Sequence, residues 1–377
     1  MDSSQKLTNT DVKKLNKNRI FRLIYNSDKI SRQEIADQLG LSLPTVNQNL
    51  KMLMEDGLIE YVGNFTSTGG RRAQAITINN NARKAISVNI KADYINVDVV
   101  GLKGQIIYSM AVKAHFSKSS AYIEKLTDAV RHAVDYVGAD ADDILGVGIT
   151  VPGILDDEKQ ILISAPPLKA KNYDFTRLIS AIDYPVVVMN DARAEAYADH
   201  WFNGKPEDEK IYIMLGEGVG GAYINASAIR HGVHNRGGEF GHMVIHPGGK
   251  QCLCGKKGCF EAYVSEKVLS SELDMTLDNF FELAAQGNKN NSNVLDEYMD
   301  NLALGINNIY TMMDCDIVLG GTVAPYLKQY DDSIKERLVN DYSFDTDADY
   351  LRISDGGGRK SAVSYTHLRA HETGAYL

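Results

Sequence analysis

The sequence predicts an α/β protein with an N-terminal winged helix-turn-helix head and a larger, two-lobed α/β body built by duplication. Three observations predict this fold. Residues 1–84 carry 13 Lys and Arg against 8 Asp and Glu, whereas the rest of the chain carries 27 against 41. The head shows the apolar spacing of short helices, and the body repeats strand hairpins followed by strand–helix units. A length of 377 residues allows two or three domains.

Composition narrows the class of function. The net charge of −9 argues against a protein that coats nucleic acid along its whole length, but a basic head on an acidic body is typical of a small nucleic-acid-binding module joined to another domain. No run of 18 apolar residues occurs, so no membrane-spanning helix is expected. The N-terminus lacks the apolar segment of a signal peptide. With only four cysteines, we expect a cytoplasmic protein whose clustered thiols serve metal or redox chemistry.

The head is expected to begin with two helices. The first covers residues 16–26, and its buried face comprises Ile20, Phe21 and Ile24. Ser31 and Glu34 fit a capping box, in which each side chain satisfies a backbone N–H of the other residue. Gly40 suits the left-handed conformation that ends the second helix.

A third helix is expected after Ser42, its N-cap, with Pro44 in the first turn, where a missing N–H costs little. Its inward residues are predicted to be Leu43, Val46, Leu50 and Leu53. The residues left facing outward are Thr45, Asn47, Gln48, Asn49 and Lys51. Asn and Gln side chains can pair bidentately with adenine in the major groove, which favours a helix-turn-helix.

Residues 58–79 indicate a β-hairpin, the wing, with Arg71 and Arg72 at its Thr/Gly-rich tip. Guanidinium groups there can bind phosphates or a narrow minor groove. The residues expected to bind DNA are Thr45, Asn47, Gln48, Lys51, Arg71 and Arg72. The alternative is a helical hairpin that serves only packing or dimerisation.

The body, residues 85–362, shows the same pattern twice. The first lobe, about 85–200, is expected to contain strands at 85–90, 94–101, 104–112 and 144–153 and a helix at 122–137. The second lobe, about 201–362, is expected to contain strands at 211–218, 219–227, 242–246 and 314–321, and its pattern begins near Lys210. A cleft between two such lobes is the default position for a small ligand.

Cysteines gather in the second lobe as Cys252, Cys254 and Cys259, with His242 ten residues before the first of them. One imidazole and three thiolates form the closed tetrahedral ligand set of a structural zinc ion. Gly255 and Gly258 allow the loop to turn back. A redox role is the alternative to zinc, although no CxxC pair occurs, and His246 is a rival ligand.

Five segments together resemble the ROK family (repressors, uncharacterised reading frames and sugar kinases). They are ITVPGILD (149–156), VVVMNDARAEAYAD (186–199), LGEGVGG (215–221), GGEFGHM (237–243) and CLCGKKGCFEA (252–262). The resemblance covers the chain to about residue 362 and implies an actin-like/sugar-kinase fold, that is, a duplicated RNase H-like body. Head and body together resemble the family's transcriptional repressors, such as those of xylose metabolism.

The resemblance also implies roles for individual residues. It favours His242 over His246 as the zinc ligand beside Cys252, Cys254 and Cys259. The residues that match the family's sugar contacts are Asn190, Asp191, Glu239, His242 and Glu261, and Asp191 matches the kinases' general base. The alternative for Asp191 alone is a helix cap.

The phosphate half of the family's kinase site is altered. The kinases' Asp-x-Gly-Gly-Thr turn corresponds to residues 89–94, where Asn89 replaces Asp and Lys91, Ala92 and Asp93 replace Gly-Gly-Thr. Glu217 adds a negative charge to the second phosphate loop. Cβ atoms and carboxylates at these positions disfavour phosphate, so no ATP and no enzymatic activity are expected.

Two further features limit what the resemblance implies. LGEGVGG contains the dinucleotide pattern GxGxxG, but a strand is expected after it instead of a helix, so we interpret it as a remnant hairpin. Pro167 stands where the family usually has Asn, so sugar selectivity does not transfer. Residues 363–377 resemble the translation of a sequencing adapter joined to a truncated frame, and we interpret them as an artefact tail.

The sequence therefore predicts a sugar-responsive DNA-binding regulator, most simply a repressor of carbohydrate-utilisation genes. A sugar or sugar phosphate would bind between the lobes, zinc would hold the cysteine loop, and a homodimer or dimer of dimers would bind palindromic operator DNA. An active ATP-dependent sugar kinase and a constitutive DNA-binding protein with an inert body are the alternatives.

Overall fold

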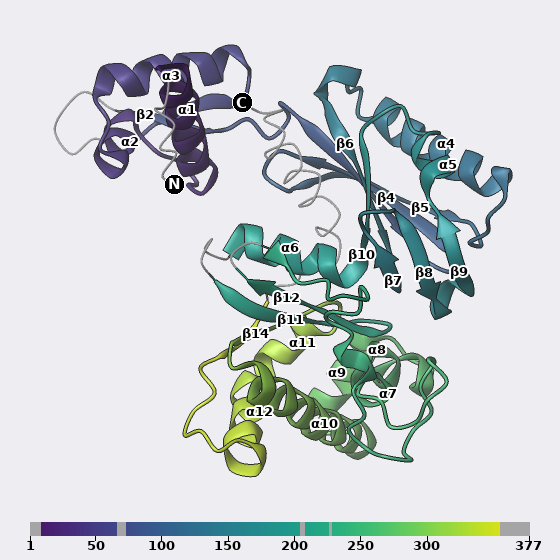
Figure 1. Cartoon of the computed structure of the whole chain (residues 1–377). Coiled ribbons are helices and arrows are strands. Elements are labelled where there is room, and N and C mark those ends of the chain that lie inside the picture. Colours follow the sequence, from purple (N-terminus) through teal and green to yellow (C-terminus); the bar gives the residue numbers. More distant parts are fainter. Residues whose placement is uncertain (1–8, 66–72, 204–207, 226–227, 355–377) are drawn as a thin grey trace, which may run out of the picture.

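The fold is that of a computed structural model (Figure 1), which describes residues 9–65, 73–203, 208–225 and 228–354. The wing tip with Arg71 and Arg72 and the segment 363–377 lie outside the described residues. A head (purple in Figure 1) lies beside the first lobe, and the second lobe follows the first along the chain.

The head has the helix-turn-helix and wing that the sequence predicts. Its elements are α1 (Asn9–Tyr25), α2 (Arg32–Leu39), α3 (Leu43–Glu55), β1 (Ile59–Asn64) and β2 (Gln74–Ile78). The capping box of Ser31 and Glu34 is present, and Gly40 ends α2 with φ of 63°. Ser42 caps α3 by accepting a hydrogen bond from the Thr45 N–H. These local signals correctly predicted where α2 begins and ends and where α3 begins.

Two predictions about α3 were wrong. Leu43 is 42% exposed, because it lies in the first turn of the helix, outside the apolar cluster that buries Val46. Asn49, predicted to face outward, is 3% exposed, and its Nδ2 donates to the Thr45 carbonyl at 2.8 Å. Its position, three residues after Val46, places it on the inner face of the helix.

The wing is attached to the start of α2. Strands β1 and β2 pair antiparallel, with Ile59 opposite Ile78. Ile30, in the connection between α1 and α2, exchanges both backbone hydrogen bonds with Ile76 of β2. The hairpin therefore packs against the helix-turn-helix through this pairing, as the wing of a winged helix-turn-helix does.

The first lobe is built on a sheet in the order β10-β6-β3-β4-β5. Its strands and main helix are β3 (Lys84–Ile90), β4 (Tyr94–Gly101), β5 (Ile106–Lys113), α4 (Ser120–Tyr136), β6 (Ile144–Val151) and β10 (Val186–Asn190). A smaller sheet, β7-β8-β9, and a short helix complete it: β7 (Ile154–Asp156), β8 (Ile161–Ala165), β9 (Ala170–Asp174) and α5 (Thr176–Ile179).

The second lobe is built on a sheet in the order β13-β12-β11-β14-β15. Its strands are β11 (Glu209–Leu215), β12 (Val219–Asn225), β13 (Ala228–Ile229), β14 (Asp316–Gly320) and β15 (Leu351–Ile353). Its helices include α6 (Asp191–Asn203), α7 (Glu261–Val264), α8 (Glu266–Leu269), α9 (Leu277–Ala285), α10 (Lys289–Met313), α11 (Ala324–Leu327) and α12 (Asp331–Arg337). Among the described residues, no helix is long and apolar enough to cross a membrane.

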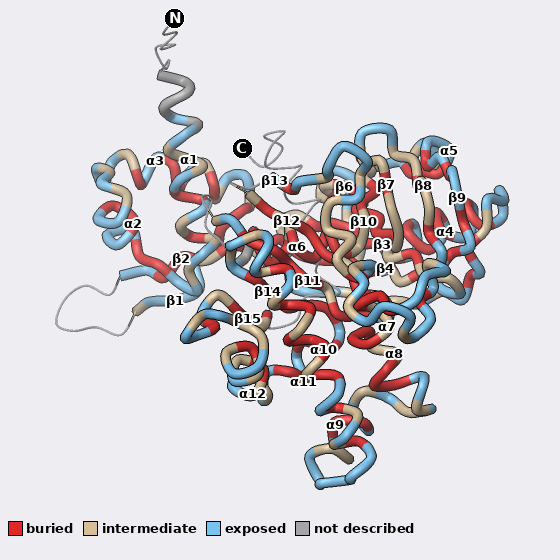
Figure 2. Tube along the Cα trace, turned by 60° about the horizontal axis from the view of Figure 1, so that its bottom comes forward, coloured by how far each residue is buried: buried red, intermediate tan, exposed pale blue. Residues whose placement is uncertain are grey.

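The predicted duplication is confirmed by the topology of the two sheets. In each lobe an antiparallel meander begins the sheet, and two later strands add in parallel beside its first strand: β6 and β10 beside β3, β14 and β15 beside β11. The central strands of both sheets are buried (Figure 2). Helix α6 follows β10 of the first lobe and packs through Ala196 against Tyr212 and Ala222 of the second sheet, so it links the lobes.

The prediction of a strand at residues 242–246 was wrong. Residues Phe240–His242 form a 3-10 turn, and Val244 makes only an isolated bridge with Cys259. The apolar run Met243–Ile245 suggested a strand, but Val244 is 51% exposed and the chain curves around the cysteine loop. The close approach of Gly258 to the His246 carbonyl fixes that curve.

Candidate functional site

Helix α3 presents a polar face suited to DNA. Asn47, Gln48 and Lys51 are exposed, and Lys51 lies 3.7 Å from Glu55 in a surface ion pair. Thr45 is half-buried, and its hydroxyl is 2.8 Å from that of Ser42 at the helix start. The two amides are therefore the side chains of α3 best placed to reach base edges.

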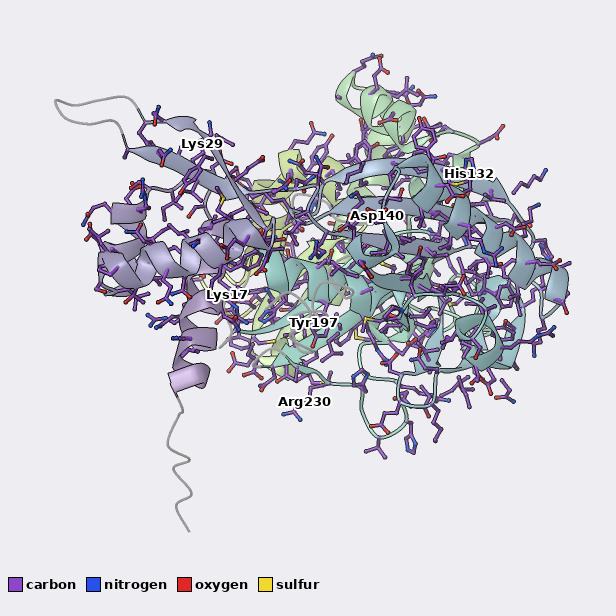
Figure 3. The ribbon with its side chains drawn as sticks, turned by 90° about the horizontal axis from the view of Figure 1, so that it is seen from above. Lys17, Lys29, His132, Asp140, Tyr197 and Arg230 are labelled. Atoms are coloured by element: carbon purple, nitrogen blue, oxygen red, sulfur yellow. The ribbon has the colours of Figure 1, made fainter. Side chains whose placement is uncertain are left out.

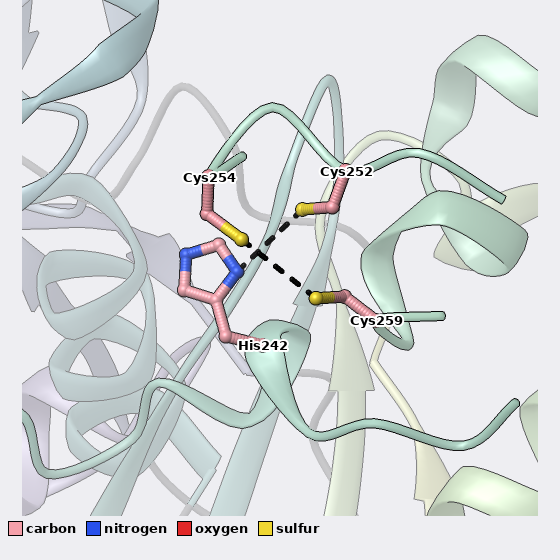
Figure 4. A group of neighbouring side chains, drawn as sticks. All are labelled: His242, Cys252, Cys254 and Cys259. Atoms are coloured by element: carbon pink, nitrogen blue, oxygen red, sulfur yellow. Dashed lines mark hydrogen bonds between the residues drawn. The ribbon is translucent and has the colours of Figure 1, made fainter. Parts of the chain in front are cut away.

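The four expected metal ligands converge (Figure 4). The ligand atoms of His242, Cys252, Cys254 and Cys259 all lie within 4.8 Å of one another. Cys254 Sγ is 3.7 Å from Cys259 Sγ, and Cys252 Sγ is 3.8 Å from His242 Nδ1. Sulfurs bound tetrahedrally at about 2.3 Å from zinc would stand about 3.8 Å apart. The cluster therefore has the size and donor set of a tetrahedral metal site.

The rival ligand, His246, does not join this cluster. Its Nε2 lies 2.5 Å from Asn301 Oδ1 on α10, and its ring packs edge-on against Tyr263. The imidazole is thus engaged with the core of the second lobe, while His242 directs Nδ1 toward Cys252.

The loop that carries the cysteines is shaped by its glycines and its backbone hydrogen bonds. Gly255 and Gly258 have φ of 87° and 81°, which side chains rarely adopt. A Cβ at Gly258 would lie 1.8 Å from the His246 carbonyl oxygen. Burial raises the pKa of the Cys252 and Cys259 thiols, so thiolates here need a compensating cation.

The predicted sugar contacts Asn190 and Asp191 lie where β10 ends and α6 begins. Asn190 Nδ2 donates to the Gly153 carbonyl at 2.9 Å, and its Oδ1 accepts the Arg193 N–H at 3.0 Å. Asp191 Oδ1 accepts the Ala192 N–H at 3.0 Å. Asn190 therefore caps α6 by accepting the N–H of Arg193, and Asp191 is the first residue of the helix. The Oδ2 of Asp191 faces Lys91.

The other predicted sugar contacts, Glu239, His242 and Glu261, lie beside the metal cluster. Glu239 Oε2 lies 3.8 Å from His242 Nε2, and Cys252 Sγ lies 3.7 Å from Glu261 Oε1. Glu261 also accepts the Val219 N–H at 2.9 Å. Burial raises the pKa of Glu239, and the nearby carboxylates of Asp191 and Glu261 add to that rise. Glu239, His242 and Glu261 thus lie around the cysteine cluster, whereas Asn190 and Asp191 lie at the start of α6.

Lys91 pairs with Asp191, a contact that the sequence analysis did not predict. Its Nζ lies 3.9 Å from Asp191 Oδ2, and both side chains are largely buried. Burial opposes the charge of Lys91, but Asp191 and Glu217 outweigh it, so the pKa of Lys91 is raised. Burial raises the pKa of Asp191 and Lys91 opposes that rise. Neighbouring Asp93 instead pairs with His115 at 2.8 Å.

Arg193 is a second residue that the sequence analysis missed. It is 2% exposed, and its guanidinium donates to Asp157 Oδ2 at 2.9 Å and to the Asn235 carbonyl at 2.8 Å. Asp157 follows β7 of the first lobe, and Asn235 belongs to the second-lobe loop that leads to Glu239. Arg193 therefore fixes that loop against the first lobe.

Close packing explains the glycines at residues 215–221 in this chain. Strand β12 follows the turn, as predicted, and no helix begins there. A Cβ on Gly218 would lie 2.9 Å from Glu261 Oε2, and one on Gly220 would lie 2.7 Å from the Ala192 Cβ. The dinucleotide pattern therefore reflects the close packing of a hairpin.

Glu195 makes stability depend on pH. It is 6% exposed, one turn after Asp191, and accepts the Tyr212 hydroxyl at 3.2 Å. Burial, with repulsion from Asp191, raises the pKa of Glu195 to about 7 from 4.5. Because the folded pKa exceeds the unfolded one, Glu195 stabilises the fold fully below pH 4.5 and loses this contribution as pH rises through 7.

The free energy of unfolding of Glu195→Gln, relative to that of the native protein, is therefore expected to rise by roughly 3 kcal/mol as the pH increases from 4.5 to 8. The glutamine keeps an acceptor for Tyr212. Urea unfolding followed by Trp201 fluorescence, at the tryptophan on the same helix, measures the difference. Parallel stability curves of the two proteins across this pH range would contradict the assignment.

Sequence profiles identify both parts of the chain. The profile described as ROK family matches residues 85–354, and the profile described as winged helix-turn-helix DNA-binding matches residues 15–60. The chain is 29% identical to a xylose repressor of Bacillus subtilis (strain 168) over 319 residues, which cover 82% of each protein.

Solved structures agree with this fold. A ROK family transcriptional regulator, described as a homologue of the Escherichia coli MLC protein, matches 94% of this chain and 96% of its own, with a TM-score of 0.70 and 22% identity. A ROK family glucokinase from Streptomyces griseus, solved with glucose and AMPPNP, matches 76% of this chain and 98% of its own, with a TM-score of 0.63 and 25% identity. With its body matched from β3 to β15 and a winged head before it, the chain belongs to the ROK family.

Proposed function

We propose that this protein is a sugar-responsive DNA-binding transcriptional regulator, a repressor of carbohydrate-utilisation genes. One observation carries the proposal: a winged head with exposed amides on α3 is joined to a body in which Glu239, His242 and Glu261 lie around one cysteine cluster. The similarity to a xylose repressor over 82% of the chain supports the same function. The protein acts in the cytoplasm, where operator DNA lies.

Operator DNA is bound by α3 and the wing. Asn47 and Gln48 contact base edges in the major groove, with Thr45 beside them, and Lys51 contacts phosphate. Arg71 and Arg72 at the wing tip contact the backbone or the minor groove. A homodimer, or a dimer of dimers, presents paired heads to a palindromic operator.

The sugar lies against Asn190, Asp191, Glu239, His242 and Glu261. Carboxylate and amide groups suit it because they offer oriented acceptors and donors to clustered hydroxyls. The excess of carboxylates over Lys91 favours a neutral sugar over a sugar phosphate. Xylose is the first sugar to test, because a relative that matches 82% of the chain is named a xylose repressor, but Pro167 leaves the choice of sugar to experiment.

Zinc is the metal that suits the cysteine cluster. His242 through Nδ1, with Cys252, Cys254 and Cys259, gives a closed tetrahedral set, so the ion is structural. His242 Nε2 faces Glu239, so one imidazole joins the metal to the sugar site. The ion thereby holds the loop that presents Glu261.

The body acts as a sensor and not as a kinase. In the family's kinases the counterpart of Asp191 takes a proton from the sugar, and here Lys91 stands 3.9 Å from it. An ammonium ion at this distance opposes the rise in the pKa of Asp191 that burial causes. The altered phosphate loops, with Asn89 and Glu217, also disfavour ATP. The glucokinase similarity keeps the kinase as the rival function, and ATP-dependent phosphorylation of a monosaccharide, abolished by Asp191→Asn, would establish that rival.

Sugar binding tests the proposal. The full chain is titrated with xylose, glucose, N-acetylglucosamine and their phosphates while its melting temperature is recorded. One neutral sugar is expected to raise the melting temperature, and Glu261→Gln is expected to weaken that sugar's binding at least about tenfold. Glu272→Gln, an exposed position of the same lobe, serves as the control. If no sugar stabilises the chain, the body is inert and the sensor function is wrong.

A further inference from the structure

The turn between β4 and β5, residues 101–105, belongs to the first lobe but lies against the head. Leu102 in this turn is 1% exposed and packs in the apolar cluster that α1, α2, α3 and the wing form. Ala82 and Leu145 of the body pack against the same cluster. The head and the first lobe therefore share one apolar core at this point.

Polar contacts fix the same turn around Asn80. The Leu102 N–H donates to the Asn80 carbonyl at 3.0 Å, and the Lys103 N–H donates to Asn80 Oδ1 at 2.8 Å. Lys103 Nζ donates to the Ser27 carbonyl, just after α1, at 3.3 Å. A Cβ at Gly101 would lie 2.5 Å from Asn80, so glycine permits this approach.

The connection between head and body is short and held on both sides. Strand β2 ends at Ile78 and β3 begins at Lys84. Asn79 donates through its backbone N–H to Leu58 and through Nδ2 to Gly57, each at 3.0 Å. Lys84 is 8% exposed, and its Nζ donates to the Asn81 carbonyl at 3.0 Å. A flexible linker has none of these contacts.

These contacts attach the head to the first lobe of the body. They come from the first lobe through the turn 101–105, Ala82 and Leu145. Seen from above, Lys29 in the head and His132 on α4 lie on opposite sides of the molecule (Figure 3), so their separation reports how the head sits relative to the first lobe. The chain reaches the second lobe only after β10, at the start of α6.

We infer that residues 101–105 form an internal coupling surface that joins the head and the first lobe into one rigid body. A sugar bound between the lobes then moves the head by moving the first lobe relative to the second. The transmission rests on the proposed function, whereas the rigid docking does not. Without this surface, sugar and DNA would bind independently, because coupling requires that each ligand distinguish the same two arrangements.

The rigid docking is tested without any sugar. Nitroxide labels are attached at positions 29 and 132 through unnatural amino acids, which leaves the cysteines unmodified, and their separation is measured by pulsed electron spin resonance. The native chain is expected to give one narrow distance distribution and Leu102→Ala a broad one. Ile107→Ala, which shortens an exposed side chain on the same hairpin, is the matched control and is expected to match the native chain. A broad distribution in the native chain overturns the inference.

The transmission is tested by DNA affinity with and without saturating xylose. The native chain is expected to change its DNA affinity about tenfold, and Leu102→Ala by less than about twofold, with xylose binding retained. If Leu102→Ala fails to fold, Lys103→Ala, which removes only the contact to Ser27, replaces it and is expected to reduce the response. If Leu102→Ala or Lys103→Ala gives a broad distance distribution but its DNA affinity still responds to xylose as much as that of the native chain, the turn 101–105 does not couple the sugar to the head. If xylose has no effect, the sugar that stabilises the native chain replaces it. A native chain whose DNA affinity no sugar of the panel changes contradicts the proposed function instead, and the distance measurement still decides the docking.

Discussion

Replacing Cys259 by serine is expected to release the metal and to lower the melting temperature of the chain by roughly 10 °C. Cys259 is 1% exposed and packs between Cys254 and the backbone of the second lobe, with Phe260 fully buried beside it. Loss of one ligand from a closed tetrahedral set leaves the remaining thiolates without their cation. The free energy of zinc binding, of which we expect at least about 3 kcal/mol to support the fold, is then lost.

The matched control is Cys315→Ser, because Cys315 is the one cysteine of the sequence outside the cluster. Metal content by mass spectrometry and melting by calorimetry are measured on both variants. We expect one zinc per chain in the native protein and in the control, and almost none in Cys259→Ser. Equal metal content in the two variants, or a native protein purified without metal that melts at the same temperature after zinc is added, would show that the cluster does not hold a structural ion.

The double substitution Asn47→Ala and Gln48→Ala is expected to reduce the preference for operator over random DNA by at least about 30-fold. Both side chains are exposed on α3 and their amides can each pair with a base edge. Each bidentate pair contributes about 1–3 kcal/mol of discrimination, so two pairs together change the ratio of affinities by one to four orders of magnitude. Affinity for random DNA should change little.

Lys51→Ala provides the contrast on the same helix. Loss of one phosphate contact should weaken operator and random DNA alike and reduce the slope of log affinity against log salt by about 1. Asn81→Ala, an exposed amide outside the helix-turn-helix, serves as the control for amide removal. An unchanged sequence preference in the Asn47 and Gln48 double variant would mean that α3 does not read the bases.

Local signals predicted much of the fold because they act within a few residues. The capping box of Ser31 and Glu34, the turn at Gly40 and the alternation of the β11–β12 hairpin each have their cause inside the segment itself. The metal cluster was predictable for the same reason, since three of its four ligands lie within eight consecutive positions. The duplication was visible because the same succession of patterns occurs twice.

The remaining features depend on contacts between distant segments. Lys91 reaches Asp191 only because β3 and β10 both adjoin β6 in one sheet, which a single pattern along the chain does not reveal. Residues 243–245 form an apolar run like that of a short strand, but the cysteine loop, and not a sheet, lies beside them. Leu102 has the sequence context of an ordinary turn residue, and only the docked head buries it.

Fluorescence anisotropy of the full chain on DNA from its own upstream region, with and without each sugar, tests the central claim most directly. The titrations are made at one fixed salt concentration, because affinity for DNA depends steeply on salt. The account predicts specific binding that one sugar shifts by about tenfold, equivalent to about 1.4 kcal/mol of coupling. Specific binding that no sugar alters, or no specific binding at all, would contradict it.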